Sequence, residues 1–91
     1  MYNISPDAIQ INRRFFEALD ALKRGRRLSG IYGFSQKYKT TFANIYTIKN
    51  QESGVVKVEW LMYLVRDYDI SAQWLLTGEG NMFKQTTAKT L

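Results

Sequence analysis

Two short stretches of helical apolar spacing follow one another between residues 31 and 50, with room for only a tight turn between them. In the first, 31–38, apolar side chains include Phe34 and Tyr38, and in the second, which ends near residue 50, they include Ile45 and Ile48. Such spacing places each set on one face of a helix. Helices this short bury enough apolar surface only by crossing over a shared core. We therefore expect a helix-turn-helix pair in an all-α domain.

The residue types near the crossing of these two helices fit such a pair. Ser35 is small, as the position beneath the second helix requires, and Thr40-Thr41 supplies a hydroxyl N-cap for that helix. Lys39 falls where the turn usually needs a positive φ angle, which costs a lysine about 1 kcal/mol relative to glycine. A longer turn is the alternative at this position.

A first amphipathic helix is expected ahead of this pair. Asp7 to Leu22 has apolar residues at helical spacing, and Lys23 and Arg24 suit the negative end of its dipole. Gly25 is expected to end this helix in the left-handed conformation, and residues 26–30 then form a basic loop.

Two more helices are expected after the pair. Residues 58–68 form a helix whose apolar stripe is wide, which predicts a central position in the fold. Ser71 is expected to cap a short helix over 72–77, and Gly78 to end it. The expected architecture is therefore a five-helix, all-α domain.

The chain has 91 residues, which predicts one domain over residues 1–83 and a flexible C-terminal tail over residues 84–91. It contains no cysteine and no histidine, which excludes disulfides, thiolate nucleophiles and zinc fingers, and suits a cytoplasmic location. No apolar run is long enough to cross a membrane. No cofactor, metal or small-molecule substrate is expected, and without a nucleophile and base pair an enzyme is not expected either.

Basic side chains concentrate around the predicted helix pair. Residues 21–51 contain seven Lys or Arg and no Asp or Glu, and residues 13–57 contain ten basic and three acidic side chains. Residues 58–91 contain three basic and four acidic ones. A polyanion favours a surface of one sign, because each Lys or Arg that neutralises a phosphate releases condensed counterions. We expect double-stranded DNA as the partner, with the C-terminal part facing away from it.

With Ile45 and Ile48 turned inward, the second helix of the pair presents Ala43, Tyr46, Thr47 and Asn50 outward, flanked by Phe42 and Lys49. In a major groove, Asn50 would pair with adenine, and Thr47, Ala43 or Phe42 would touch thymine methyl groups. Because the strip lacks Arg and Gln, direct reading of guanine is not expected, and methyl contacts and DNA shape carry more of the specificity. The residues expected at phosphates are Arg24, Arg26, Arg27, Lys37, Lys39, Lys49 and the backbone amides at Ile31.

The segment Trp74-Leu-Leu-Thr-Gly-Glu-Gly-Asn-Met-Phe, with Val58-Glu-Trp-Leu-Met-Tyr-Leu-Val before it, resembles the last two helices of lambda-repressor-like domains of the Cro and CI type. The resemblance covers about residues 10–83 and is strongest to phage and mobile-element regulators of gut bacteria. It implies five helices, of which the second and third form the helix-turn-helix, and homodimers that repress transcription from palindromic operators.

By position, the same resemblance implies specific DNA contacts. Those at base edges are Thr41, Phe42, Ala43, Tyr46 and Thr47, and those at phosphates are near Ile31, Asn44 and Lys49. The chain departs from the family pattern at three places: Ser35 replaces the usual alanine, Lys39 the usual glycine, and Ile31 a polar phosphate-contacting residue.

The alternative function is a protein-interaction module that retains the fold without specific DNA binding. The missing Arg and Gln and the apolar Phe42, Ala43 and Tyr46 on the outward strip favour it. Phe42 itself fits either a place in the core beneath the turn or a DNA contact. Trp60 and Trp74 are expected in the core, because they stand beside leucines at helical spacing.

Overall fold

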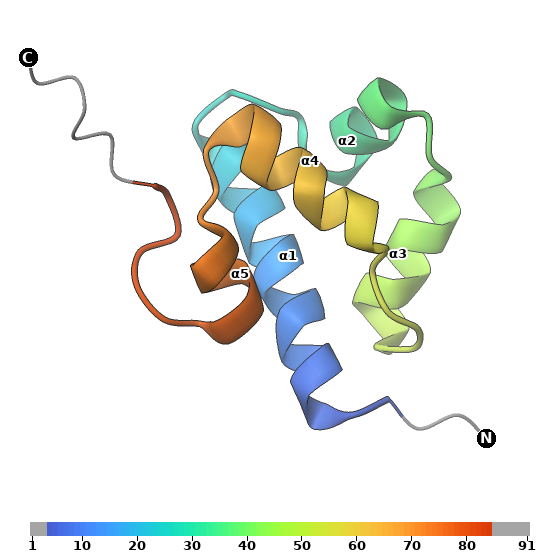
Figure 1. The fold of residues 1–91 in the computed structure, drawn as a ribbon. Coiled ribbons are helices and arrows are strands. Elements are labelled where there is room, and N and C mark those ends of the chain that lie inside the picture. The colour runs from blue at the N-terminus through green and yellow to red at the C-terminus, as the bar shows by residue number, and fades with distance from the viewer. Residues whose placement is uncertain (1–3, 85–91) are drawn as a thin grey trace, which may run out of the picture.

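The computed structural model describes residues 4–84, which form five helices and one isolated β-bridge between Ile70 and Phe83 (Figure 1). The helices are α1 (Pro6–Arg24), α2 (Gly30–Tyr38), α3 (Phe42–Gln51), α4 (Val58–Tyr68) and α5 (Ala72–Thr77). The all-α prediction is therefore confirmed for this part of the chain. None of the helices between residues 4 and 84 has the length and apolar character that crossing a membrane requires.

Helix α1 begins at a side-chain cap, because Ser5 Oγ accepts a hydrogen bond of 3.1 Å from the amide of Ala8. At its end, the predicted left-handed glycine is wrong: Gly25 has a φ of −83°, and Arg26 takes the positive φ of 62° instead. The Arg27 amide donates to the carbonyl oxygen of Leu22 at 2.9 Å. This bond back across five residues satisfies a carbonyl of the last turn and moves the left-handed position to Arg26.

Helix α1 is the centre of the fold. It contacts α2, α3 and α5, and it buries Phe15, Leu19 and Leu22 almost completely. The Phe15 ring stands edge-on to that of Phe34 in α2, with centroids 5.4 Å apart, and is stacked on Trp60 of α4 at 6.0 Å. Edge-to-face and offset aromatic pairs of this kind contribute about 0.5–1.5 kcal/mol beyond the area they bury. The two crossed helices are therefore packed directly on α1.

The predicted central position of α4 is wrong. Trp60, Leu64 and Tyr68 are buried, but Val58 is 78% exposed and Met62 43%. The buried residues occupy one face of α4, Leu61 and Val65 are partly buried beside them, and Val58 and Met62 face solvent. A wide stripe indicates only how much of a helix is apolar, and the neighbours available in the fold decide how much of it is covered.

The turn between α2 and α3 is short. It spans residues 39–41, and Lys39 takes the left-handed conformation with a φ of 54°, so the longer turn is not needed. Ser35 is buried beneath the crossing, and its hydroxyl donates to the carbonyl oxygen of Tyr32 at 2.8 Å. Thr41 is the N-cap residue of α3, yet its hydroxyl makes no capping hydrogen bond, so that part of the prediction is wrong.

A buried amide fixes the loop that follows α3. Asn12 in α1 is almost fully buried, donates to the carbonyl oxygen of Gly54 at 2.9 Å and accepts from the amide of Val56 at 3.0 Å. Both polar ends of this side chain are therefore satisfied, and losing either bond would leave a buried polar group without a partner. Sequence reasoning did not identify Asn12.

The C-terminal part largely follows the sequence prediction. Ser71 Oγ accepts from the Trp74 amide at 3.2 Å to cap α5, and Gly78 ends α5 with a φ of 82°. Lys84, which the prediction assigned to the tail, belongs to the ordered body: its amide donates to the carbonyl oxygen of Asp69 at 2.8 Å. The rest of the predicted tail, residues 85–91, lies outside the described residues.

The left-handed lysine in the turn leads to a stability prediction. Replacing Lys39 by glycine removes backbone strain of about 1–2 kcal/mol and adds unfolded-chain entropy worth about 0.4–1 kcal/mol. We expect Lys39→Gly to raise the melting temperature by about 2–6 °C in differential scanning calorimetry. Gln36→Gly, at an exposed position inside α2, is the matched control and should lower it. A lower melting temperature for Lys39→Gly would contradict the strained turn.

Candidate nucleic-acid interface

The outward strip of α3 consists of exposed side chains. The six residues that the sequence predicts at base edges are all exposed: Thr41, Phe42, Ala43, Tyr46, Thr47 and Asn50. On the opposite side of α3, Ile45 is fully buried and Ile48 is half-buried against the core. The helix therefore has the predicted orientation, with its two isoleucines inward and this strip available for contact.

An aromatic platform lies at one edge of the strip. It consists of Phe42 and Tyr46 on α3 and Tyr32 on α2, which are 43%, 47% and 61% exposed. The rings of Phe42 and Tyr46 are stacked at 17° with centroids 5.4 Å apart, and Tyr32 stands edge-on to Phe42 at 6.4 Å. Phe42 therefore does not fold into the core, and three large rings from two helices share one patch of surface.

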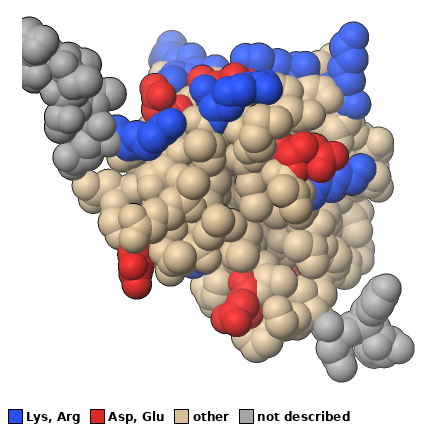
Figure 2. All heavy atoms as spheres, in the orientation of Figure 1, with Lys and Arg blue, Asp and Glu red and all other residues tan. Residues whose placement is uncertain are grey.

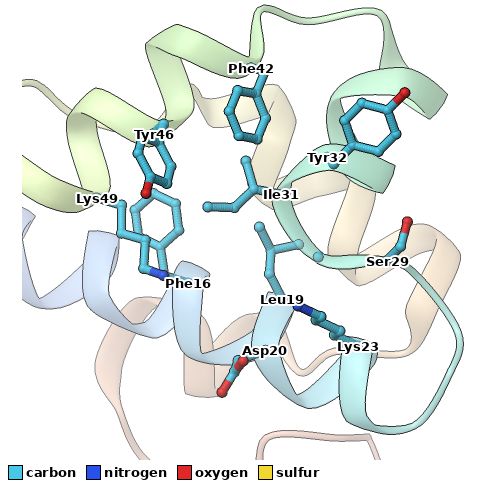
Figure 3. Close-up of a pocket in the computed structure, with 11 residues that line it drawn as sticks. Phe16, Leu19, Asp20, Lys23, Ser29, Ile31, Tyr32, Phe42, Tyr46 and Lys49 are labelled. Atoms are coloured by element: carbon cyan, nitrogen blue, oxygen red, sulfur yellow. The ribbon is translucent and has the colours of Figure 1, made fainter.

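A crevice of about 270 Å³ lies between this platform and α1. Its apolar side chains include Phe16 and Leu19 from α1 and Ile31 from α2, and Figure 3 shows the Phe42 ring above Ile31 and the Tyr46 ring above Phe16. Lys23 and Lys49 also line the crevice. In the described part of the chain, no carboxylate forms an ion pair with either lysine. Asp20 also lines the crevice, but its carboxylate is paired with Arg24 at 2.7 Å. The two ammonium groups therefore remain available to a phosphate.

The other flank of α3 is more polar. Lys39, Thr41 and Asn44 line a shallow pocket of about 220 Å³ together with residues at the start of α4. Three residues predicted near phosphates therefore lie close to the strip on one side or the other, namely Asn44 and Lys39 on this flank and Lys49 on the crevice flank. The Ile31 side chain is apolar and half-buried, so only the backbone amide of this residue is suited to a phosphate. Ser29, the N-cap of α2, makes no capping hydrogen bond with its side chain.

The remaining basic residues gather along a different edge of the molecule. Figure 2 shows Lys and Arg concentrated over the α1–α2 loop and α2, at the top of the view, while the surface below carries few charges. Arg27 and Lys37 both lie over the ring of Tyr68 in α4, at 5.5 Å and 4.9 Å from its centroid. Arg24 forms an ion pair with Asp20 at 2.7 Å. Arg24, Arg27 and Lys37 therefore already have partners within the protein.

Arg26 connects the two basic regions. It lines a shallow surface pocket with Lys23 and Ser29, which also line the crevice beside the platform. A basic surface thus continues from the α1–α2 loop to the aromatic platform. A phosphate backbone leaving the crevice in this direction would meet Lys23 first and Arg26 next.

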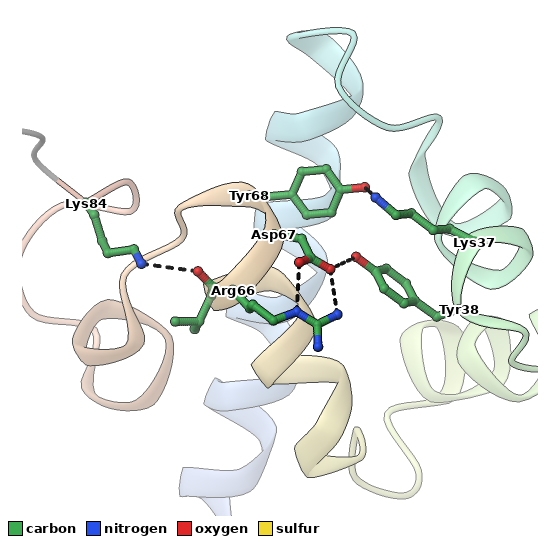
Figure 4. A network of polar contacts seen from close by, with 7 residues as sticks. Lys37, Tyr38, Arg66, Asp67, Tyr68 and Lys84 are labelled. Carbon is green, nitrogen blue, oxygen red and sulfur yellow. Dashed lines mark hydrogen bonds and ion pairs between the residues drawn. The ribbon is translucent and has the colours of Figure 1, made fainter.

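A polar network joins α2 to α4 beside this edge (Figure 4). The Tyr38 hydroxyl donates to Asp67, which also accepts two hydrogen bonds from Arg66 at 2.8 Å and 2.9 Å, and the Tyr38 ring is stacked on Tyr63 at 4.1 Å. The bonds from Arg66 and Tyr38 hold the pKa of the Asp67 carboxyl well below its usual range. Burial, followed by the bond to Asp67, raises the pKa of Tyr38. The Asp67 carboxylate therefore links α2 to α4. The described residues contain no acidic cluster able to hold a metal.

Lys37 extends this network. Its ammonium group donates to the Tyr68 hydroxyl at 3.1 Å. Reaching a DNA phosphate would require Lys37 to leave that partner, so the structure makes it a weaker candidate than Lys49.

The C-terminal end of α3 is tied to α1 by an ion pair. Arg13 Nε donates to Glu52 at 2.8 Å, which lowers the pKa of the Glu52 carboxyl and raises that of Arg13. Both side chains are exposed, so the pair contributes about 0–1 kcal/mol. Its main effect is to neutralise the carboxylate at the C-terminal end of α3.

Sequence reasoning missed two residues of this surface. Lys23 was placed in the last turn of α1, and only the packing of α1 against α2 brings it to the crevice. Tyr32 follows Ile31, but its proximity to Phe42 depends on the crossing angle of α2 and α3. The acid-free basic run could have identified Lys23, whereas nothing in the local pattern could have identified Tyr32.

The chain matches no protein-family model, no curated protein and no solved structure.

Proposed function

We propose that the chain binds double-stranded DNA in a sequence-specific manner and regulates transcription, with α3 lying in the major groove. One observation carries this proposal: the face of α3 that is free of the core is exposed along its length and is flanked by lysines that form no ion pair within residues 4–84. A major groove about 12 Å wide admits an α-helix, and phosphates flank it on both sides. The flanking positions of Lys39 and Lys49 suit this arrangement.

In this proposal the residues divide into two roles. Base edges are contacted by the exposed strip of α3, and phosphates by Lys49 and Lys23 on one flank and by Lys39 and Asn44 on the other. Arg26 extends the phosphate contact from the α1–α2 loop, whereas Arg24, Arg27 and Lys37 contribute mainly to the overall positive field.

The element order supports a lambda-repressor-like assignment. Five helices, with α2 and α3 joined by a three-residue turn, correspond to the arrangement that the sequence resemblance implies. On this basis we infer a repressor of the Cro and CI type acting in the cytoplasm. The left-handed Lys39 supports the assignment further, because it adopts at the expected position the backbone that glycine usually provides.

We infer further that two copies bind together, because a single helix-turn-helix domain contacts too little DNA for strong specificity. The surface that suits a second copy is a groove of about 290 Å³ between α4 and α5. It is lined by seven apolar side chains: Val58, Leu61, Met62, Val65, Ala72, Leu75 and Leu76. Each copy carries a net charge of +5, so two copies approach best at an uncharged surface in the part of the chain without excess positive charge.

A second candidate function is a protein-interaction module. The aromatic platform and the crevice beside it favour this function, because exposed apolar rings of this size are typical of docking surfaces. Such a module would bind a protein partner and show no affinity for DNA. The first DNA-binding experiment therefore discriminates between the two functions.

The electrostatic part of the proposal is tested by fluorescence anisotropy with labelled duplexes at several salt concentrations. If each subunit neutralises about four to six phosphates, the logarithm of the affinity should fall against the logarithm of the salt concentration with a slope of about −4 to −5 per bound subunit. A slope near zero would contradict the electrostatic part of the proposal, whereas no binding to any duplex would contradict DNA binding and favour the interaction module.

Base reading and phosphate contact can be separated by mutation. Lys49→Ala should weaken a preferred duplex and a random duplex by similar factors, because phosphates are the same in both. Asn50→Ala and Thr47→Ala should weaken the preferred duplex more than the random one, by about five- to a hundredfold for a lost base contact. Equal losses on both duplexes would exclude base reading by these residues. Gln73→Ala, at an exposed position on α5 and outside the residues assigned to DNA, is the control.

The second-copy surface is tested by sedimentation equilibrium of the free protein. Val58→Lys and Met62→Lys place a charge in the groove, and we expect each to weaken self-association tenfold or more, because burying an unpaired charge is costly. Val55→Lys is the matched control, since Val55 is similarly exposed but lies outside the groove. Equal self-association in the unmodified protein and in all three variants would exclude this surface.

A further inference from the structure

Packing against neighbouring side chains keeps the rings of the aromatic platform at the surface. Phe42 and Tyr46 stand one helical turn apart on α3 and are stacked on each other, while Tyr32 on α2 supports Phe42 from the side. Leu19 and Ile31 lie beneath them and line the crevice. The rings therefore have neighbours that hold them at the surface, and each keeps a large fraction of its area exposed.

The chemistry of this platform differs from that of a hydrogen-bonding reading face. Phe42 and Ala43 have no side-chain donor or acceptor, and the outward strip contains no Arg or Gln that could form paired hydrogen bonds with guanine. Among the groups that a base pair presents in the major groove, the methyl group on C5 of thymine is the apolar one. A platform of aromatic rings gains most from burying that group.

We propose that the platform recognises the 5-methyl group itself, so that α3 prefers thymine over uracil and 5-methylcytosine over cytosine at the contacted positions. The inference rests on the proposed DNA binding and specifies what the reading face selects. Thymine and 5-methylcytosine carry the methyl group on the same ring carbon, at the same edge of the major groove. Binding at such positions is then controlled by methylation of cytosine as well as by base sequence.

The lysines beside the platform make this contact possible. Lys23 and Lys49 line the crevice next to Phe42 and Tyr46, so phosphates bound there hold the adjacent base edges against the rings. The phosphate contacts supply affinity without selecting a base, and the rings add selectivity. Burying one methyl group on such a surface strengthens binding about fourfold.

The test uses the full chain and a preferred duplex selected from random oligonucleotides. Thymines in that duplex are replaced one at a time by deoxyuridine, which removes the methyl group and keeps the base pair. At contacted positions we expect about fourfold weaker binding in fluorescence anisotropy. At the same positions, replacing the pair by C·G and then methylating that cytosine should restore about the same factor.

Variants of the platform show whether the rings cause this difference. The double variant Phe42→Ala with Tyr46→Ala should bind the thymine and deoxyuridine duplexes equally. Tyr46→Phe keeps the ring and should retain the preference. A thymine preference that persists in the double variant would originate in duplex shape and would overturn the proposal.

The remaining outcomes separate this inference from the proposed function. If the chain binds the selected duplex better than random DNA but binds thymine and deoxyuridine duplexes equally, methyl recognition is wrong and DNA reading stands. If it binds no duplex, or binds selected and random duplexes equally with or without methyl groups, both are wrong.

Discussion

The burial of Ile45 determines what the surface of this protein can do. Ile45 is fully buried, as is Phe34 of the neighbouring helix, and Phe34 stands edge-on to Phe15 of the central helix α1. Because Ile45 fixes the inner face of α3 against the core, the opposite face of this helix is turned to solvent. The exposed strip from Ala43 to Asn50 is therefore a direct result of core packing, and any change that rotates α3 would move the whole strip together.

The same packing divides the positive charge into two regions. Lys23 and Lys49 lie beside the aromatic platform without acidic partners in the described part of the chain, whereas Arg27 and Lys37 are held over the Tyr68 ring. Cations held by internal partners must give up those contacts before they bind a phosphate, so the two regions would contribute unequally to the proposed DNA binding. The net charge is thus a poor measure of how many phosphates the protein would contact, and the position of each cation matters more.

Most of the secondary structure could be predicted from the sequence, because apolar periodicity, Ser71 and Gly78 act over a few residues. The errors occurred where a particular hydrogen bond, or the way the helices pack, decides the outcome. At the end of α1, a hydrogen bond from Arg27 to Leu22 shifts the left-handed residue from Gly25 to Arg26. Lys84 joins the body because Asp69, fifteen positions earlier, accepts its amide. In α4, the apolar stripe predicts burial, but no described helix covers Val58.

By itself, the sequence determined five helical segments, a positively charged middle part and which residues of α3 face outward, because these depend on spacing along the chain. Only the tertiary structure decided which cations lie beside that face, and that Tyr32 joins Phe42 and Tyr46 in one aromatic platform. The physical reason is distance: residues on different helices become neighbours through the crossing angles of those helices. Those angles follow from how the buried side chains of α1, α2 and α3 fit together.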